Sequence, residues 1–184
     1  NSYKDNNQVI RILVGSKCFL LEIPLIGYFQ IKNLLMAVLA ARNCGIKQKK
    51  IFNQLKKIKP VPGRLECVSK LNKNSKIIID FAHTPDALEQ SLKSIKKQFK
   101  SKIIVVFGCG GERDEKKRKL MGLIAKKYCR KIFVTDDNPR NENPKKIRRE
   151  IIQGCKKSAV EIGNRKEAIR LAINEMGPKD ILLV

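Results

Sequence analysis

From residue 66 onward, short apolar runs alternate with longer stretches in which apolar residues recur every three or four positions. The runs are rich in Ile, Val and Leu, as in strands buried on both faces, and lie at residues 76–80, 102–107, 131–135 and 180–184. The stretches between them predict amphipathic helices with these stripes: Leu88, Leu92, Ile95 and Phe99; Leu120, Met121, Ile124 and Tyr128; Ile147, Ile151 and Cys155; Ala168, Ile169, Ala172 and Met176. Thr84 and Asn143 each precede a proline, which is typical of a capped helix start. The alternation predicts an α/β fold, a Rossmann-like open and mostly parallel sheet with helices on both faces.

The first 63 residues follow a different pattern. Residues 9–14 and 18–25 predict a hairpin around a Gly-Ser turn. Residues 31–43 predict a helix that is apolar on most of its circumference, so we expect it to be buried on most sides. An amphipathic helix follows, and the Pro-Val-Pro-Gly segment at residues 60–63 predicts a domain boundary. We expect one domain at residues 64–184 and part of another at residues 1–63.

The formal net charge of +23 raises the hypothesis of a nucleic-acid or membrane-surface partner. The basic residues are spread over many predicted helices, Trp is absent, and aromatic residues make up 5% of the chain, which leaves few platforms for base stacking. We therefore interpret the charge as a solvated surface that suits anionic small substrates, with no specific nucleic acid and no membrane as partner. A basic nucleic-acid-binding module remains the alternative.

Lys or Arg interrupts every apolar run before it reaches the roughly 20 residues that cross a bilayer, so we expect a soluble, cytoplasmic protein. The cysteines lie roughly twenty residues or more apart, which excludes the CxxC spacing of zinc and redox sites. We predict reduced cysteines, most of them in the core, and no metal site in this segment. The chain begins with Asn1 instead of Met and stops inside a predicted strand, so we expect a segment of a longer protein.

Unusual polar clusters follow three of the predicted strands at their carboxyl ends, where ligands bind in open α/β sheets. Residues 80–85 read Asp-Phe-Ala-His-Thr-Pro, residues 108–114 read Gly-Cys-Gly-Gly-Glu-Arg-Asp, and residues 136–140 read Asp-Asp-Asn-Pro-Arg. Each cluster alone is also compatible with a simple turn. The glycines permit close approach of a phosphate or carboxylate, but no Gly-Lys-Ser/Thr follows them, so they form no Walker P-loop.

The order and spacing of these clusters resemble the Mur ligases from about residue 24 to the end of the chain. Residues 27–33 resemble the family's Gly-x-Phe-Asn-x-x-Asn segment, with Gln30 in place of Asn, and residues 62–64 resemble its Pro-Gly-Arg linker. Residues 80–85 match its Asp-Tyr-Ala-His-x-Pro segment, with Phe81 in place of Tyr, and residues 107–114 match its glycine-rich loop. The resemblance is greatest to the MurE type, and the tetrapeptide at residues 137–140 is identical to the signature of the family members that add meso-diaminopimelate.

The resemblance implies an ATP-dependent ligase of peptidoglycan biosynthesis. The family activates a peptide carboxylate with the γ-phosphate of ATP, and an amine attacks the acyl phosphate. The resemblance implies UDP-N-acetylmuramoyl-L-alanyl-D-glutamate and meso-diaminopimelate as substrates, and ATP with Mg²⁺ as cofactors. The P-loop, carbamylated lysine and magnesium ligands belong to the family's central domain, whose tail residues 1–63 resemble. We therefore expect no catalytic residue here, an inactive segment, and a monomeric ligase.

The resemblance also implies two sets of binding residues. It assigns the nucleotide to Asn33, Arg64, Asp80 and His83. It assigns meso-diaminopimelate to Arg113, Asp137, Asn138, Pro139 and Arg140. Asn33 has an alternative, because an Asn on a buried helix must find a hydrogen-bond partner and backbone can supply it. Lysine-adding relatives differ at the position of Arg140; such a relative, or a folylpolyglutamate synthase, is the alternative within the family.

Overall fold

The computed structural model describes residues 2–4, 6–71 and 74–184, so Asn1 lies outside the described residues. The chain divides into two compact units, Asn1–Glu66 and Cys67–Val184. The division falls three residues after the boundary expected at residue 63. Each unit has its own sheet.

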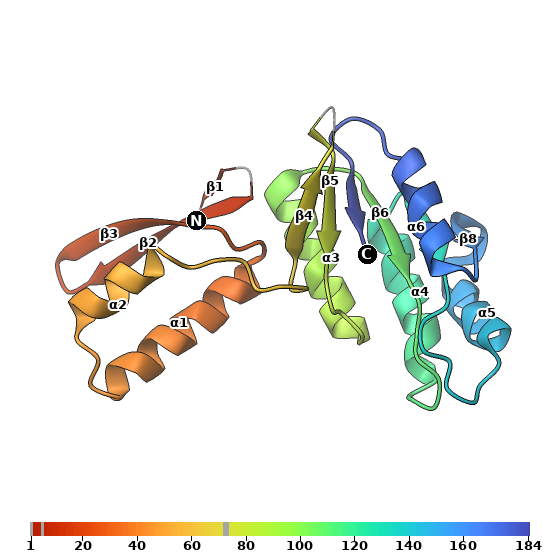
Figure 1. Cartoon of the computed structure of the whole chain (residues 1–184), viewed down its shortest axis with the longest axis horizontal. Coiled ribbons are helices and arrows are strands. Elements are labelled where there is room, and N and C mark those ends of the chain that lie inside the picture. Colours follow the sequence, from red (N-terminus) through yellow and green to blue (C-terminus); the bar gives the residue numbers. More distant parts are fainter. Residues whose placement is uncertain (1, 5, 72–73) are drawn as a thin grey trace. The chain divides into compact units, whose positions relative to one another are not determined.

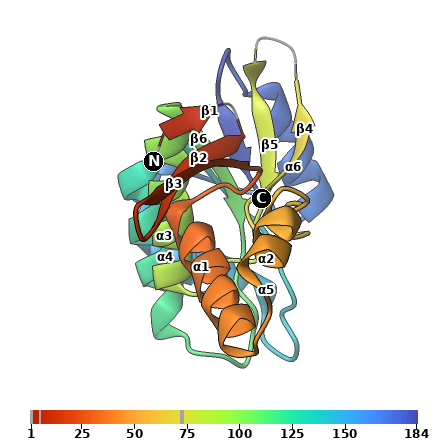
Figure 2. The ribbon, with the colours of Figure 1, turned by 90° about the vertical axis from the view of Figure 1, so that its left-hand side faces the viewer.

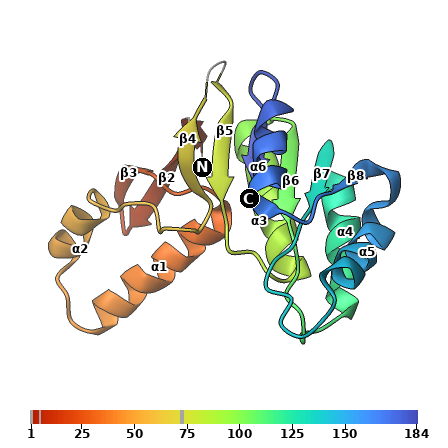
Figure 3. The ribbon, with the colours of Figure 1, turned by 45° about the vertical axis from the view of Figure 1, so that its right-hand side comes forward.

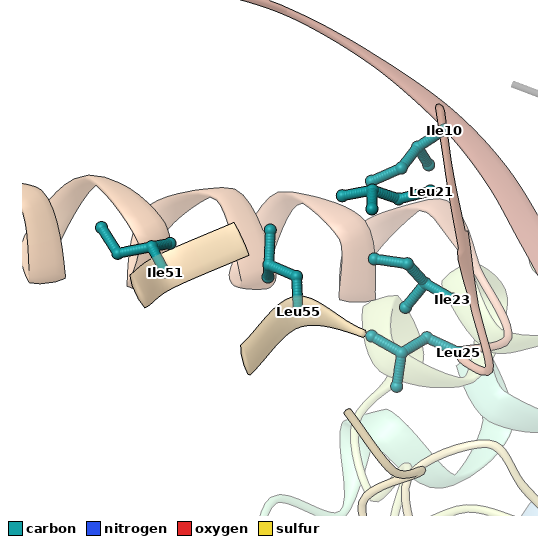
Figure 4. Close-up of a cluster of buried hydrophobic side chains, with 6 residues drawn as sticks. All are labelled: Ile10, Leu21, Ile23, Leu25, Ile51 and Leu55. Atoms are coloured by element: carbon teal, nitrogen blue, oxygen red, sulfur yellow. The ribbon is translucent and has the colours of Figure 1, made fainter. Parts of the chain in front are cut away.

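The first unit is a small antiparallel sheet with two helices (Figures 1 and 2). The predicted hairpin is confirmed as β2 (Asn7–Val14) and β3 (Lys17–Ile23), and a short strand that we did not predict, β1 (Ser2–Lys4), pairs with β2. The helices are α1 (Tyr28–Asn43), which begins three residues earlier than predicted, and α2 (Gln48–Leu55). Figure 4 shows the buried core of this unit, to which the hairpin, the segment after it and α2 contribute Ile10, Leu21, Ile23, Leu25, Ile51 and Leu55. Partly buried residues of α1, among them Leu34 and Val38, pack against this core.

The prediction that residues 31–43 are buried on most sides is wrong. Within α1 only Gln30 is buried, while Leu35, Met36 and Leu39 are 51%, 67% and 45% exposed. One face of α1 packs on the hairpin and α2, and no described element of this unit covers the other faces. The apolar circumference of α1 therefore does not indicate burial on most sides within this unit.

The second unit contains a six-stranded sheet in the order β4-β5-β9-β6-β7-β8. All four predicted strands are confirmed as β5 (Lys76–Ile79), β6 (Ile103–Phe107), β7 (Lys131–Val134) and β9 (Ile181–Leu183). Two more, β4 (Glu66–Lys70) and β8 (Ala159–Glu161), were missed because they are short or polar. The pairs β5–β9, β9–β6, β6–β7 and β7–β8 are parallel, as predicted.

Helices cover both faces of this sheet (Figure 3). One face packs on α6 (Arg165–Asn174), whose Ala168 and Ala172 join the cluster around Ile104. The other face carries α3 (Pro85–Phe99), α4 (Lys116–Tyr128) and α5 (Pro144–Cys155). The predicted caps are present, because Thr84 Oγ1 accepts from the Ala87 amide and Asn143 Oδ1 from the Lys145 amide. Because β5, β6 and β7 run in the same direction, the loops β5–α3, β6–α4 and β7–α5 all lie at the carboxyl ends of the strands, along the lower side of the sheet in Figure 1.

The predicted apolar stripe of α4 is partly wrong. Met121 is buried, but Leu120 is 49% exposed, and the buried face consists of Arg118, Met121, Gly122 and Ala125. Residues at these spacings share one face of a helix, so an arginine occupies a position that the pattern reserves for an apolar residue. The predicted stripe of α5 is confirmed, with Ile147, Ile151 and Cys155 buried.

Helices α4 and α5 approach closely through two glycines. A Cβ at Gly154 would lie 2.2 Å from the Lys119 carbonyl oxygen, and one at Gly122 would lie 2.2 Å from the Ile151 carbonyl oxygen. Both obstacles are backbone atoms, so no side-chain rotation can relieve them. The small residues therefore set the distance between the two helices.

Replacing Gly154 by alanine is expected to destabilise the protein by about 1–3 kcal/mol, because the overpacked helices must separate. The gain in helix propensity, about 1 kcal/mol, opposes this loss and does not cancel it. The measurement is urea unfolding of the wild type and the variant. Gly177→Ala is the control, because its Cβ would have no neighbour closer than 3.4 Å. Equal unfolding midpoints for Gly154→Ala and the wild type would contradict the prediction.

Candidate functional site

The loops β6–α4 and β7–α5 interlock at the carboxyl edge of the sheet. The Gly111 amide donates to the Asn138 carbonyl oxygen at 2.9 Å, and Arg140 Nη1 donates to the Gly111 carbonyl oxygen. A Cβ at Gly111 would lie 1.9 Å from the Pro139 carbonyl oxygen, so only glycine fits at this contact. Two clusters that are separate in the sequence therefore form one surface, which carries Asn138, Pro139 and Arg140.

Local hydrogen bonds shape the turn at residues 137–140. Asp137 Oδ1 accepts from the Asn138 amide at 2.8 Å, and Asn138 Oδ1 accepts from the Arg140 amide at 3.2 Å. Arg140 adopts a left-handed backbone with φ of 49°, which is uncommon for a residue with a side chain. Among the described residues its exposed guanidinium bonds only to Gly111, so its other N–H groups remain for a ligand.

Arg113 lies in the β6–α4 loop, two residues after Gly111. Its side chain is exposed and makes no hydrogen bond or ion pair with residues 6–71 or 74–184. The neighbouring Glu112 has a left-handed backbone, and its carboxylate accepts from Asn141 Nδ2 at 2.6 Å across the two loops. The structure thus brings Asn138, Pro139 and Arg140 against the glycine-rich loop. Arg113 belongs to the same loop, but no hydrogen bond or ion pair in the described part of the chain connects its side chain to these three residues.

The β5–α3 loop carries Asp80 and His83. Asp80 Oδ2 accepts from Ser91 Oγ on α3, which fixes the carboxylate at the end of β5. His83 Nδ1 lies 3.1 Å from the Phe81 carbonyl oxygen. Because a carbonyl oxygen only accepts, Nδ1 is the donor in this contact, which orients the imidazole ring. Lys117 Nζ donates to the His83 carbonyl oxygen at 3.0 Å, which ties this loop to the start of α4.

Asn33 and Arg64 lie in the first unit, and both are exposed. The alternative for Asn33 assumed a buried helix, and the exposure of the Asn33 side chain removes that need for a backbone partner. Gln30, which stands where the family has Asn, is buried and donates to the carbonyl oxygens of Ile26 and Arg64 at 3.1 and 2.8 Å. It therefore links the start of α1 to the linker, a role that the sequence did not reveal.

Sequence reasoning also missed a buried arginine behind the loops. Arg118 has a fully buried side chain, and its two terminal nitrogens donate to the Glu142 carboxylate at 2.9 and 2.8 Å. Its Nη1 also donates to Glu150 on α5 at 2.7 Å. Glu142 in turn accepts from the Glu112 amide. The one sequence signal that could have indicated this burial is the position of Arg118, which shares a helix face with the apolar Met121 and Ala125.

Protonation of Glu142 is expected to weaken the second unit in acid. The bond from Arg118, with the Glu112 amide second, lowers the Glu142 pKa from 4.5 to about 2. The pKa is depressed on folding, so the stabilisation is complete above 4.5 and is lost as the pH falls through about 2. Urea unfolding of the wild type and Glu142→Gln from pH 7 to 2 should give a stability difference that narrows below pH 4.5. A difference that does not depend on pH would contradict this assignment.

The described residues offer no cluster of three His, Cys, Asp or Glu side chains for a metal. Burial raises the pKa of the Cys109 thiol to about 11, so this thiol is neither a ready ligand nor a nucleophile at neutral pH. All six cysteines are free, as predicted, but Cys18 and Cys44 are exposed and only Cys109 and Cys155 are fully buried. The expectation that most cysteines lie in the core is therefore wrong. The donor set of this segment does not by itself fit Mg²⁺.

Comparison with known proteins identifies the family. Residues 63–184, about two thirds of the chain, match the family described as "Mur ligase, glutamate ligase domain". The chain belongs to the Mur ligase family. It is 47% identical over 180 residues to the UDP-N-acetylmuramoyl-L-alanyl-D-glutamate--2,6-diaminopimelate ligase of Rickettsia montanensis, and 41% identical over 179 residues to that of Rhizobium meliloti. These matches cover 96% and 97% of the chain and 37% of each relative.

Solved structures of Mur ligases and their relatives have the same fold. A UDP-N-acetylmuramoyl-L-alanyl-D-glutamate--2,6-diaminopimelate ligase aligns with a TM-score of 0.67 and 32% identity over 99% of this chain and 38% of that chain. A Mycobacterium tuberculosis folylpolyglutamate synthase complexed with ADP aligns with a TM-score of 0.74. It is 15% identical over 99% of this chain and 45% of that one, which supports the fold alone.

This Mur ligase chain spans a little over a third of the curated relatives that it matches. In the described part of the chain, no helix has the length and apolar character needed to cross a membrane.

Proposed function

We propose that this chain is the amino-acid-binding part of an ATP-dependent ligase that adds meso-diaminopimelate to UDP-N-acetylmuramoyl-L-alanyl-D-glutamate. The observation that carries the proposal is the interlock of the two loops, which presents Arg140 with guanidinium N–H groups available to a ligand. The ligases named for this reaction in Rickettsia and Rhizobium are the relatives at 47% and 41% identity.

The chemistry of the amino acid explains the choice of side chains. Diaminopimelate differs from lysine by a second carboxylate, and a guanidinium gives that group paired, charge-assisted hydrogen bonds. In the proposed site Arg140 binds this carboxylate, while Arg113 and Asn138 bind the remaining polar groups. Asp137 shapes the turn through its bond to the Asn138 amide, and Pro139 supplies the backbone that meets Gly111.

The nucleotide belongs to a second part of the proposal. ATP supplies the phosphoryl group that activates the acceptor carboxylate, and Asn33, Arg64, Asp80 and His83 bind it. Asp80 is suited to ribose hydroxyls because its carboxylate is fixed at a strand end by Ser91. Residues 1–63 form the tail of the ATP-binding domain. The magnesium ligands and the catalytic lysine belong to the rest of a complete ligase, which works as a monomer.

A complete ligase that contains this segment tests the function directly. Release of ADP is measured with the UDP-linked dipeptide and, in turn, meso-diaminopimelate, lysine and glutamate as the amino acid. The proposal expects meso-diaminopimelate to be used by far the best. Preference for lysine would indicate a lysine-adding relative. In a parallel assay with a folate in place of the UDP-linked dipeptide, use of glutamate would indicate a folylpolyglutamate synthase, and either result refutes the proposal.

A nucleic-acid-binding module is the second candidate because of the charge of +23. It requires tight binding whose logarithm falls steeply with the logarithm of salt concentration. We expect only weak binding of this chain to duplex DNA, lost at physiological salt. Titration of the chain with labelled DNA at several salt concentrations separates the two functions.

A further inference from the structure

The loop at residues 136–142 is held at both ends by arginines that lie outside it. Arg148 on α5 binds Asp136, where the chain leaves β7. Arg118 on α4 binds Glu142, where the chain approaches α5. The Asp-Asn-Pro-Arg turn lies between these two attachments. The loop therefore has few ways to move unless one of the ion pairs breaks.

The first attachment joins a nearly buried arginine to two partly exposed carboxylates. Arg148 is 7% exposed, its Nη1 donates to Asp136 Oδ1, and its Nε donates to Glu161 Oε1 on β8 at 2.8 Å. The Asp136 amide also donates to the Gly163 carbonyl oxygen at 3.1 Å. A Cβ at Gly163 would lie 3.1 Å from Asp136 Oδ2 and 3.2 Å from Arg148 Nη1, so the space around this pair is already filled.

The second attachment reaches both loops of the site. The Arg118 guanidinium donates to both carboxylate oxygens of Glu142 and also to the Glu150 carboxylate. Because Glu142 also accepts from the Glu112 amide, the arginine fixes the glycine-rich loop through the carboxylate. The second attachment thus sets the spacing between the loop that carries Arg113 and the loop that carries Arg140.

Stability alone does not explain a buried arginine at this position. The neighbours of Arg118 on the buried face of α4 are Met121, Gly122 and Ala125. Replacing a buried ion pair by apolar residues of similar volume is often neutral or stabilising, because burial removes the charges from water. Fixing the position of a loop is a use of such a pair that an apolar residue cannot replace.

We propose that Arg118 and Arg148 are positioning residues that hold the loop at residues 136–142 in the conformation in which Arg140 selects the amino-acid substrate. This inference rests on the proposed function, and it adds two residues to the determinants of selectivity that do not themselves touch the substrate. A guanidinium that moves by about 1 Å loses its alignment with a carboxylate, and such a displacement can lower a rate about 100-fold.

The kinetic test uses Arg118→Met and Arg148→Met in a complete ligase that contains this segment. We expect the KM for meso-diaminopimelate to rise at least about 10-fold and the preference over lysine to fall, while the KM for ATP changes less than about two-fold. Arg130→Met is the matched control. Arg130 pairs with Asp180 at 2.5 Å just before β7, at the opposite edge of the same sheet. It should leave the KM for meso-diaminopimelate and the selectivity unchanged.

The outcomes separate the two proposals. If the unmodified ligase does not use meso-diaminopimelate, the proposed function fails. If it does, and both variants keep its KM and selectivity, the positioning role fails while the function stands. An equal change in Arg130→Met would also refute the positioning role, because it would mean a general loss of stability.

Amide hydrogen exchange in this chain gives a second measurement that needs no activity. In Arg118→Met and in the milder Glu142→Gln, the Gly111 and Glu112 amides should exchange about 10-fold faster, since both donate across the two loops. Amides of β6, such as Val105, should keep their protection. Unchanged exchange at Gly111 and Glu112 would overturn the attachment through Arg118.

Discussion

Replacing Arg140 by alanine in a complete ligase that contains this segment is expected to lower the preference for meso-diaminopimelate over lysine by a factor of about 10⁴. In the proposed site the wild-type guanidinium must lose water when the amino acid binds, and only the diaminopimelate carboxylate replaces that water with paired hydrogen bonds. Lysine leaves the guanidinium unpaired, and a site built around a polar partner rejects an analogue that lacks it. Alanine removes both the hydrogen bonds that favour diaminopimelate and the unpaired guanidinium that disfavours lysine.

The measurement is kcat/KM for each amino acid at saturating ATP. Arg140→Lys should give an intermediate preference, because an ammonium keeps the charge and loses the planar fork. Arg149→Ala is the control, since Arg149 is an exposed arginine of α5 outside the loop. An unchanged ratio in Arg140→Ala would remove this residue from the site.

The sheet of the second unit was predictable because its signals are local and strong. The runs around Ile78, Val105, Phe133 and Leu182 are rich in Ile, Val and Leu, and each became a strand. The burial predicted for both faces is confirmed throughout β6 but is wrong at Ile79 of β5, which is 38% exposed. The caps at Thr84 and Asn143 were predictable for the same reason, because the cap and its amide partner lie within three residues of each other. By contrast, β8 has three residues and is a strand because of its pairing with β7.

Helix burial was predicted less well, since it depends on what packs against the helix. The apolar circumference of α1 says nothing of which side meets the hairpin, and Met36 is exposed although it is apolar. In α4 the pattern favoured Leu120, but the structure buries Arg118 because Glu142 and Glu150 come to it from other elements. A periodicity cannot show a partner that lies 24 or 32 residues away.

The candidate site was also predictable only in part. The polar turns could be found from their place after apolar strands, and the structure puts two of them in contact. The contact itself depends on Gly111 facing Pro139, and the ends of the loop depend on Asp136 and Glu142. Those pairs join residues that no local rule connects, so the candidate binding residues could be predicted from the sequence, whereas the residues that hold them in place could not.

Replacing Gly111 by alanine is expected to reduce the activity of a complete ligase by at least about 100-fold, the scale of a 1 Å displacement near the reacting groups. The added Cβ would lie 1.9 Å from the carbonyl oxygen and 2.7 Å from the carbonyl carbon of Pro139. Because both are backbone atoms, the loops must separate, and the bonds of Gly111 to Asn138 and Arg140 break. Folding stability should fall by about 1–3 kcal/mol.

Gly110→Ala is the matched comparison, because the added Cβ approaches a side-chain atom, whereas the Cβ of Gly111→Ala approaches backbone atoms. Its Cβ would lie 3.0 Å from Arg140 Nη1, a flexible end that can shift at little cost. We expect near-normal urea unfolding for Gly110→Ala with reduced preference for meso-diaminopimelate, and losses in both properties for Gly111→Ala. If Gly111→Ala retained full activity and stability, the loops would not need the close backbone contact, and the interlock could not be what presents Arg140 to the substrate.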